Sequence, residues 1–171
     1  MADTLVLGLG NEIIADDGAG IFAARALTER LAGKADVVES ALCGMALLDL
    51  FLGYRHAIII DAVQTLRCPP GTIHALTPGD LDAVQAPSPH YAGLPEMLAL
   101  AKQLNLDFPQ EINILALEVV DPYTIGGALS EPVKEALPEL VRRVEELVGQ
   151  WEDSGPVDGN ELEKLPAGLS M

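Results

Sequence analysis

The sequence predicts an α/β protein with three layers, α/β/α, in which helices flank a twisted, mostly parallel sheet. Short apolar segments alternate with amphipathic segments in the order β-α-β-α-β over the first third of the chain. Such alternation is typical of a parallel sheet covered on both faces. A chain of 171 residues, 49% of them hydrophobic, can bury one substantial core but has little length for a second. We therefore expect residues 1–151 to form a single domain.

The first five elements follow from apolar patterning. Residues 4–8, 37–39 and 56–61 are short apolar or β-branched runs, which predict strands. Residues 20–31 carry small and apolar side chains at helical spacing and predict an amphipathic helix, and residues 45–52 predict a shorter one. In such an arrangement, functional loops lie outside the carboxyl ends of the strands.

The middle of the chain is less regular. Residues 71–76 and 111–117 predict two further strands, and residues 94–104 predict a helix. Residues 85–90 are punctuated by prolines and predict an irregular loop, while residues 121–127 predict a turn-rich connection.

The last helix has the clearest pattern in the chain. Apolar side chains form one stripe over residues 133–148, opposite charged residues, and Ser130 is a candidate N-cap. Pro138 should kink this helix or mark its first turn. After Trp151, residues 152–171 are rich in acidic residues, glycine and proline without periodicity, so we expect a mobile acidic tail without a chemical role.

Charge and composition exclude several partners. The formal net charge of -16 would repel nucleic acid and anionic membranes, and no apolar stretch is long enough to span a bilayer. The beginning of the chain lacks the pattern of a signal peptide, so we expect a cytoplasmic protein, and a monomer by default. Cys43 and Cys68 are isolated and are expected to be reduced thiols.

The glycine-rich turn at residues 8–11 has two interpretations. It could open a dinucleotide-binding motif, but Ile13 stands where the third glycine is required. Asp16 and Asp17 would also repel a pyrophosphate. The other interpretation is a tight turn with two acids near a helix N-terminus.

Two acids and one histidine are the candidate chemical groups. Asp61 follows four apolar residues and should reach the carboxyl edge of the sheet, close to the loop carrying Asp17. His90 lies in the proline-bounded loop. The alternatives are capping of the following loop by Asp61 and a structural role for His90. Together the three residues form an O, O, N donor set without a thiolate, suited to nickel or zinc only as an incomplete site.

Other protease signatures are absent from the sequence. There is no H-E-x-x-H pair, no G-x-S-x-G elbow around a serine and no sign of a Cys-His couple. His56 and His74 fall at strand positions that do not favour a shared site.

The sequence resembles the hydrogenase maturation endopeptidases. The resemblance is carried by residues 5–11 (LVLGLGN), 16–20 (DDGAG), 60–62 (IDA) and 88–90 (SPH), and by the turn at 126–129, so that it spans residues 4–148. In that family, as the resemblance implies, three residues coordinate metal at a cleft, and they correspond to Asp17, Asp61 and His90. The first position is often glutamate in relatives, and aspartate is one methylene shorter. Cys43 and Gly44 depart from a glycine-rich segment that faces the substrate in relatives.

The resemblance implies an endopeptidase that removes the C-terminal extension of the nickel-loaded [NiFe]-hydrogenase large-subunit precursor. Nickel would be supplied by the substrate, with no tightly bound cofactor, and the mechanism would be of an aspartic or metal-dependent type. The three residues would complete the shell of a nickel ion that the precursor already holds through cysteine thiolates. A water activated by a carboxylate or polarised at the metal is our hypothesis for cleavage.

Three rival interpretations differ in class. A peptidyl-tRNA hydrolase would share the residue 8–11 motif, but 10 Lys and Arg against 26 acids argue against tRNA binding. A nickel-site chaperone would bind the same precursor without cutting it. A free-standing zinc hydrolase would retain zinc after purification.

Overall fold

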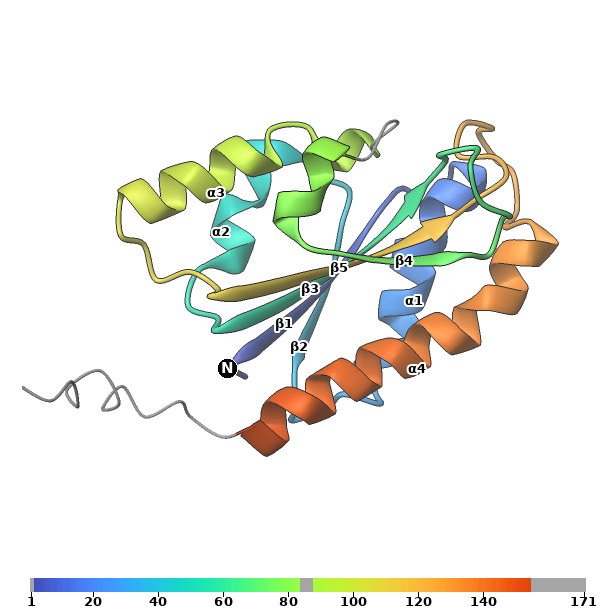
Figure 1. The fold of residues 1–171 in the computed structure, drawn as a ribbon. Helices are drawn as coiled ribbons and strands as arrows, with labels where there is room; N and C mark the ends of the chain where they lie inside the picture. Colours follow the sequence, from blue (N-terminus) through green and yellow to red (C-terminus); the bar gives the residue numbers. More distant parts are fainter. Residues whose placement is uncertain (1, 84–87, 155–171) are drawn as a thin grey trace, which may run out of the picture.

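The computed structural model describes residues 2–83 and 88–154. Within these ranges, five strands form one sheet of order β2-β1-β3-β5-β4 (Figure 1). β1 pairs in parallel with β2 and β3, β3 pairs in parallel with β5, and β4 runs antiparallel to β5 at one edge. The mostly parallel sheet is therefore confirmed. The strands are β1 (Thr4–Leu9), β2 (Asp36–Ser40), β3 (His56–Val63), β4 (Ile73–Leu76) and β5 (Glu111–Glu118).

Helices cover both faces of the sheet, as Figure 1 shows. α1 (Ala19–Thr28) and the long α4 (Glu131–Ser154) lie on one face, and α2 (Leu48–Phe51) and α3 (Leu94–Gln103) lie on the other. Alternate side chains of β3 point into the two hydrophobic clusters, with Ile58 and Ile60 on the α1 side and Ile59 on the α3 side. The three-layer α/β/α prediction is confirmed.

Four short 3-10 turns link these elements and carry much of the carboxyl edge. They are η1 (Ala15–Gly18), η2 (Gly44–Leu47), η3 (Pro78–Ala83) and η4 (Pro89–Tyr91). The helix expected over residues 45–52 is divided between η2 and α2.

The largest departures from expectation concern β3 and α4. β3 continues to Val63, so Asp61 lies inside the strand, paired with Ala116, instead of ending it. α4 runs through Pro138 and past Trp151, so Pro138 is internal and residues 152–154 are helical, not part of a tail. Packing of the apolar stripe on the sheet offsets the backbone hydrogen bond that proline removes. The rest of the expected mobile tail, residues 155–171, lies outside the described residues.

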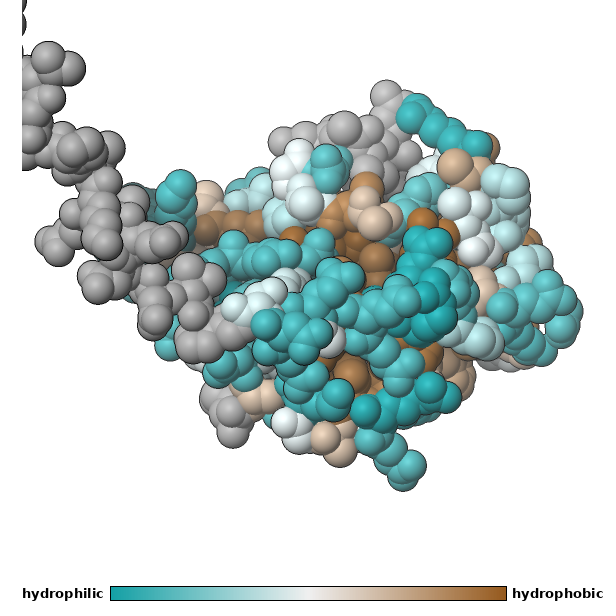
Figure 2. Space-filling model, turned by 60° about the horizontal axis from the view of Figure 1, so that its bottom comes forward, coloured by the Kyte–Doolittle hydropathy of each residue, from teal (hydrophilic) through white to brown (hydrophobic). Residues whose placement is uncertain are grey.

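The solvent face of α4 is strongly polar. Figure 2 shows hydrophilic side chains dominating the face that α4 presents, with apolar side chains visible in gaps between them. Arg142 bridges Glu139 and Glu146 along this face. None of the helices in residues 2–83 and 88–154 is long and apolar enough to cross a membrane.

Glycine allows α1 to approach the sheet closely. A Cβ on Gly20 would lie 2.2 Å from the carbonyl oxygen of Leu9 and 2.5 Å from that of Ile60. Real Cβ atoms do not tolerate such contacts with backbone, so α1 would have to move away from β1 and β3. Because η1 leads directly into α1, this contact also fixes the position of Asp17.

Gly20→Ala should therefore lower the free energy of unfolding by about 2–4 kcal/mol, as overpacking of a core does. Gly149→Ala is the matched control, because a Cβ at Gly149 in α4 meets nothing within 4 Å. That change should raise stability by about 0.5–1 kcal/mol through helix propensity. Urea denaturation of both variants measures the difference, and equal effects would contradict the close-approach explanation.

Candidate functional site

The turn that carries Asp16 and Asp17 folds back over the end of β1. Gly10 has φ +145°, and a Cβ there would lie 2.0 Å from the carbonyl oxygen of Asp17. Only glycine combines this backbone conformation with this contact. The second glycine of the residue 8–11 turn thus brings η1 against the carboxyl edge of the sheet, which is the tight-turn interpretation of that segment.

Asp16 anchors the loop before α4. Its side chain is fully buried. It accepts hydrogen bonds from the N–H groups of Val120, Asp121 and Ser130 at 3.0, 3.0 and 2.7 Å, and from the Ser130 hydroxyl at 2.8 Å. Ser130 directly precedes α4, as the N-cap prediction requires. Its hydroxyl, however, donates a hydrogen bond to Asp16, which that prediction did not include. The carboxylate of Asp16 therefore joins two loops more than 100 residues apart in sequence.

Asp17 turns the other way, toward His90. Its Oδ2 accepts a hydrogen bond from the Asn11 N–H at 2.9 Å and lies 3.8 Å from His90 Nε2. That separation fits an ion pair but is too long for a hydrogen bond. Asp17 is 8% exposed, so the carboxylate is nearly buried yet keeps a route to solvent.

Asp61 is delivered by the central strand β3, between β1 and β5. The side chain is fully buried. Its Oδ1 accepts the Ala62 N–H at 2.8 Å, while Oδ2 has no hydrogen-bond partner within residues 2–83 and 88–154. Burial raises the pKa of Asp61 to about 7, although the His90 charge, the Ser88 side chain and the Ala62 N–H lower it; the Asp17 charge adds a smaller increase. A carboxyl group with this pKa can gain or release a proton near neutrality.

Two groups orient His90: the hydroxyl of Ser88 and the backbone carbonyl of Leu42. Ser88 caps η4, its hydroxyl oxygen accepting the His90 N–H at 3.3 Å. His90 Nδ1 lies 3.1 Å from the Leu42 carbonyl oxygen. Because a carbonyl only accepts, this contact puts a proton on Nδ1 and directs Nε2 toward Asp17. Nε2 itself has no hydrogen-bond partner.

The charge of His90 is set by its surroundings. Burial opposes the protonated imidazole, but the carboxylates of Asp17 and Asp61 outweigh burial and raise the pKa of His90 to about 9. The structure thus brings Asp17, Asp61 and His90 within electrostatic reach of one another at the carboxyl edge of the sheet. His56 and His74 lie elsewhere: His56 stacks on Trp151 at 4.7 Å, and His74 Nε2 lies 3.0 Å from Glu118.

The three residues do not form a closed metal site. Within the part of the chain that the structure describes, no three His, Cys, Asp or Glu side chains are grouped to hold a metal ion by themselves. Yet Asp61 Oδ2 and His90 Nε2 are buried polar atoms without a hydrogen-bond partner among the described residues, which is costly unless something binds them. The donor set of two carboxylates and one imidazole fits a metal ion whose other ligands come from elsewhere.

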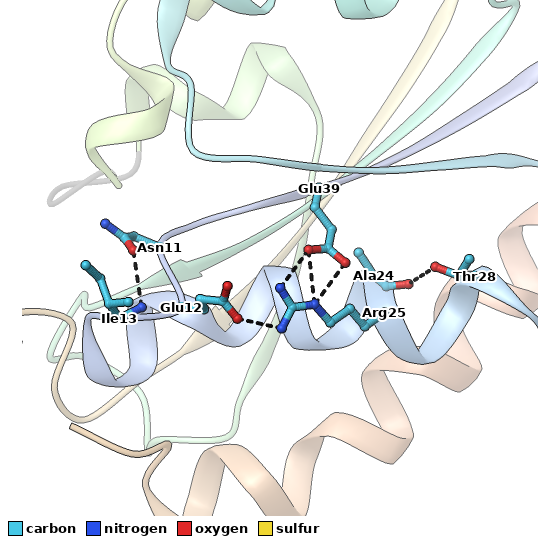
Figure 3. A network of polar contacts seen from close by, with 7 residues as sticks. All are labelled: Asn11, Glu12, Ile13, Ala24, Arg25, Thr28 and Glu39. Carbon is cyan, nitrogen blue, oxygen red and sulfur yellow. Dashed lines mark hydrogen bonds and ion pairs between the residues drawn. The ribbon is translucent and has the colours of Figure 1, made fainter. Parts of the chain in front are cut away.

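An ion-pair network ties the first loop to the edge of the sheet. Arg25 on α1 donates from Nε to Glu39 on β2 at 3.0 Å, and its Nη1 donates to Glu12 at 2.5 Å (Figure 3). Figure 3 also shows Asn11 capping the turn, its Oδ1 accepting the Ile13 N–H at 3.2 Å. The side chains are exposed, so each pair contributes modestly, but together they restrain the loop that precedes Asp17.

A pocket of about 180 Å³ opens beside the three residues. Asp17, Gln64 and Ser88 are the polar residues of its lining, and the rest of the lining is largely apolar. The pocket is lined by Ile14, Asp17, Ala62, Val63, Gln64, Ser88, Pro89, Pro122 and Tyr123.

Sequence reasoning missed several supporting groups. The Leu42 carbonyl is a backbone atom, so no side-chain pattern could identify it. Ser88 had a signal, because a serine two residues before a histidine in a short turn is a common cap. Tyr91 is buried with an unpartnered hydroxyl, and burial together with the Asp61 charge raises its pKa well above 10. Cys43, which is exposed, occupies the N-cap position of η2 one residue after Leu42 but makes no capping hydrogen bond through its side chain.

Comparisons with known proteins agree with one another. The sequence profile of the HycI family, described as hydrogenase maturation protease, matches residues 21–147. The hydrogenase 2 maturation protease of Escherichia coli is 30% identical over 149 residues, which are 81% of this chain and 90% of that protein. The hydrogenase expression/formation protein HupD of Thiocapsa roseopersicina is 27% identical over 154 residues, which are 87% of this chain and 69% of that protein.

Solved structures show the same fold. The hydrogenase maturating endopeptidase HybD from E. coli superposes with a TM-score of 0.72 at 23% identity, covering 91% of this chain and 94% of that one. The [NiFe] hydrogenase maturation protease HybD from Thermococcus kodakarensis superposes with a TM-score of 0.68 at 28% identity, covering 86% of this chain and 99% of that one.

The adjacent aspartates should respond differently to the same substitution. Asp16→Asn replaces one carboxylate oxygen by an amide NH2 group, which cannot accept hydrogen bonds from the buried N–H donors. This change should lower the free energy of unfolding by about 3 kcal/mol. Asp17→Asn keeps an oxygen for the Asn11 N–H and should change stability by less than about 1 kcal/mol. Urea denaturation measures both values. A smaller loss for Asp16→Asn than for Asp17→Asn would refute the anchoring role of Asp16.

Both raised pKa values make the fold less stable as pH rises. Between about pH 4 and 7 the folded protein retains a proton on Asp61 that the unfolded chain has released, and between about 6.5 and 9 the same holds for His90. The stability that these protons confer is lost as pH rises through those ranges. Asp61→Asn mimics the neutral acid and should stabilise the protein at pH 8 by on the order of 2 kcal/mol, with little gain at pH 4. Denaturation at both pH values tests this, and a variant less stable than wild type at pH 8 would contradict it.

Proposed function

The chain belongs to the hydrogenase maturation protease family, and we propose that it is the endopeptidase that removes the C-terminal extension from the nickel-loaded large-subunit precursor of a [NiFe]-hydrogenase. The observation that carries this proposal is the convergence of Asp17, Asp61 and His90, with His90 Nε2 and Asp61 Oδ2 buried and unpartnered. Such atoms are costly in a folded protein unless a ligand binds them.

Nickel in the precursor is the proposed ligand. The metal is part of the substrate, held there by cysteine thiolates, and the protease adds two carboxylates and one imidazole. Neither partner alone then has a complete shell, so the protease recognises the metal as well as the peptide. The Leu42 carbonyl supports this role by holding one proton of His90 on Nδ1, so Nε2 is the nitrogen that releases its proton and becomes the ligand atom when the metal binds.

The proposed chemical step uses proton exchange near neutrality. The pKa of Asp61, raised by burial to about 7, suits a group that accepts a proton from an attacking water and returns it to the leaving amine. Substrate nickel would polarise the scissile carbonyl or the water. Attack on the carbonyl carbon and breakage of the C–N bond then yield one carboxylate and one amine terminus. Metal coordination by Asp61 would lower its pKa. Asp61 would therefore transfer a proton only while its carboxylate oxygen is not bound to the metal.

The test is mass spectrometry of a nickel-loaded large-subunit precursor incubated with this protein. We expect loss of the C-terminal extension, and no loss from a precursor without nickel. Asp17→Asn, Asp61→Asn and His90→Gln should each reduce the cleavage rate by about 100-fold or more while the fold is retained. Asp153→Asn, an exposed change near the end of α4, is the control for loss of one acid.

Each alternative outcome would lead to a different conclusion. A precursor that binds but keeps its mass would indicate a nickel-site chaperone. Equal cleavage with and without nickel would refute metal recognition. Full activity in any of the three site variants would remove that residue from the proposed mechanism.

A further inference from the structure

We propose that the pocket beside Asp17 binds one apolar side chain of the substrate, at a residue that directly flanks the scissile bond. This inference rests on the proposed function and adds a specificity determinant to it. The ligand class is a leucine-like or phenylalanine-like side chain in an extended segment of the precursor.

The lining of the pocket favours an apolar occupant. Its walls are formed mostly by aliphatic side chains and rings, with Gln64 and Ser88 as neutral polar residues. Asp17 is the one acidic residue among the described residues that line it, and none of them is Lys, Arg or His. An acidic substrate side chain would face the Asp17 carboxylate without a compensating cation, and the protein carries a formal net charge of -16. The apolar walls are Ile14, Ala62, Val63, Pro89, Pro122 and Tyr123.

The size of the pocket suits a single side chain. Its volume is about 180 Å³. An apolar protein cavity of ~150 Å³ accommodates a benzene molecule, so one aliphatic or aromatic side chain would fill this one. Two large side chains would not fit.

The pocket is continuous with the candidate site. Ala62 follows Asp61 in β3, Pro89 precedes His90 in η4, and Asp17 belongs to both the pocket and the site. Consecutive residues of an extended peptide are at most ~3.6 Å apart along the chain. A side chain in the pocket therefore places its own peptide bonds beside the three residues.

The rim of the pocket is held in place before any substrate binds. Ile14 and Ile125 form an isolated antiparallel bridge, and the Gly126 N–H donates to the Ile13 carbonyl at 2.7 Å. Asp121 Oδ1 accepts the N–H groups of Tyr123 and Thr124, both at 3.0 Å. These bonds fix the loop that carries Pro122 and Tyr123, so less entropy is lost on binding.

Apolar surface remains exposed on this rim. Tyr123 is 75% exposed, Ile125 79% and Ile13 60%. All three come from the two loops joined by the bridge, beside the mouth of the pocket. Exposed apolar side chains gathered on two joined loops are typical of an interaction site. Burying part of it against the precursor would add to the stabilisation that the occupied pocket provides.

The experiment is a panel of nickel-loaded precursors in which each of the two residues flanking the scissile bond is replaced, one at a time, by Leu, Phe, Asn or Asp. At one of the two positions we expect kcat/KM to be at least tenfold higher for Leu or Phe than for Asp, as hydrophobic pockets discriminate. Tyr123→Ser removes one wall and should reduce that preference severalfold, chiefly by raising KM for the apolar substrates. Leu104→Ser, an exposed change at the end of α3, should leave both rate and preference unchanged.

The failure of this inference is distinguishable from the failure of the proposed function. Cleavage of all precursors at equal rates at both positions would overturn the pocket assignment while the protease function stands. A preference that persists fully in Tyr123→Ser, with thermal unfolding unchanged, would also overturn it. Absence of cleavage for every precursor, including the unaltered one, would overturn the proposed function and the inference that rests on it.

Discussion

The site depends on the adjacent acids Asp16 and Asp17 facing in opposite directions. Asp16 has a structural role. Its buried carboxylate accepts hydrogen bonds from three N–H groups of the residue 120–130 loop, and these bonds join the turn after β1 to the loop before α4. Asp17, the next residue, is thereby turned toward His90. A 3-10 turn makes this possible because consecutive side chains point about a third of a turn apart. This anchor acts together with the Arg25 network and the bridge between Ile14 and Ile125 to restrain the loop that carries the proposed ligand.

The burial of Asp61 works against the stability of the fold. Asp61 is buried in the central strand, where desolvation raises its pKa to about 7, and one of its oxygens has no partner. His90 is held protonated by the two carboxylates, with a pKa of about 9. A core of ordinary apolar residues at these positions would be more stable. Such an arrangement is typical of a functional site, because binding of a cation would satisfy the Asp61 oxygen that destabilises the protein alone.

Several contacts between loops and strands support the site. The Arg25 network holds the first loop against β2, the Leu42 carbonyl orients His90, and the bridge between Ile14 and Ile125 closes the rim of the pocket. Each contact joins a different pair of elements at the carboxyl edge of the sheet. The recognition elements proposed here, metal ligands and an apolar pocket, therefore lie on one preorganised surface, which lowers the entropic cost of binding a peptide.

Local pattern in the sequence determined the element types, the three-layer architecture and a candidate set made of an acid in the first loop, Asp61 and His90, because strand and helix periodicities and the carboxyl-edge rule act over short stretches of chain. Only the tertiary structure decided which aspartate anchors and which faces His90, since both occupy one loop and their partners lie more than 70 residues away. It also decided the antiparallel direction of β4, the passage of α4 through Pro138 and the role of the Leu42 carbonyl. These features depend on packing between distant segments and on backbone atoms, which every residue possesses and no side-chain pattern distinguishes.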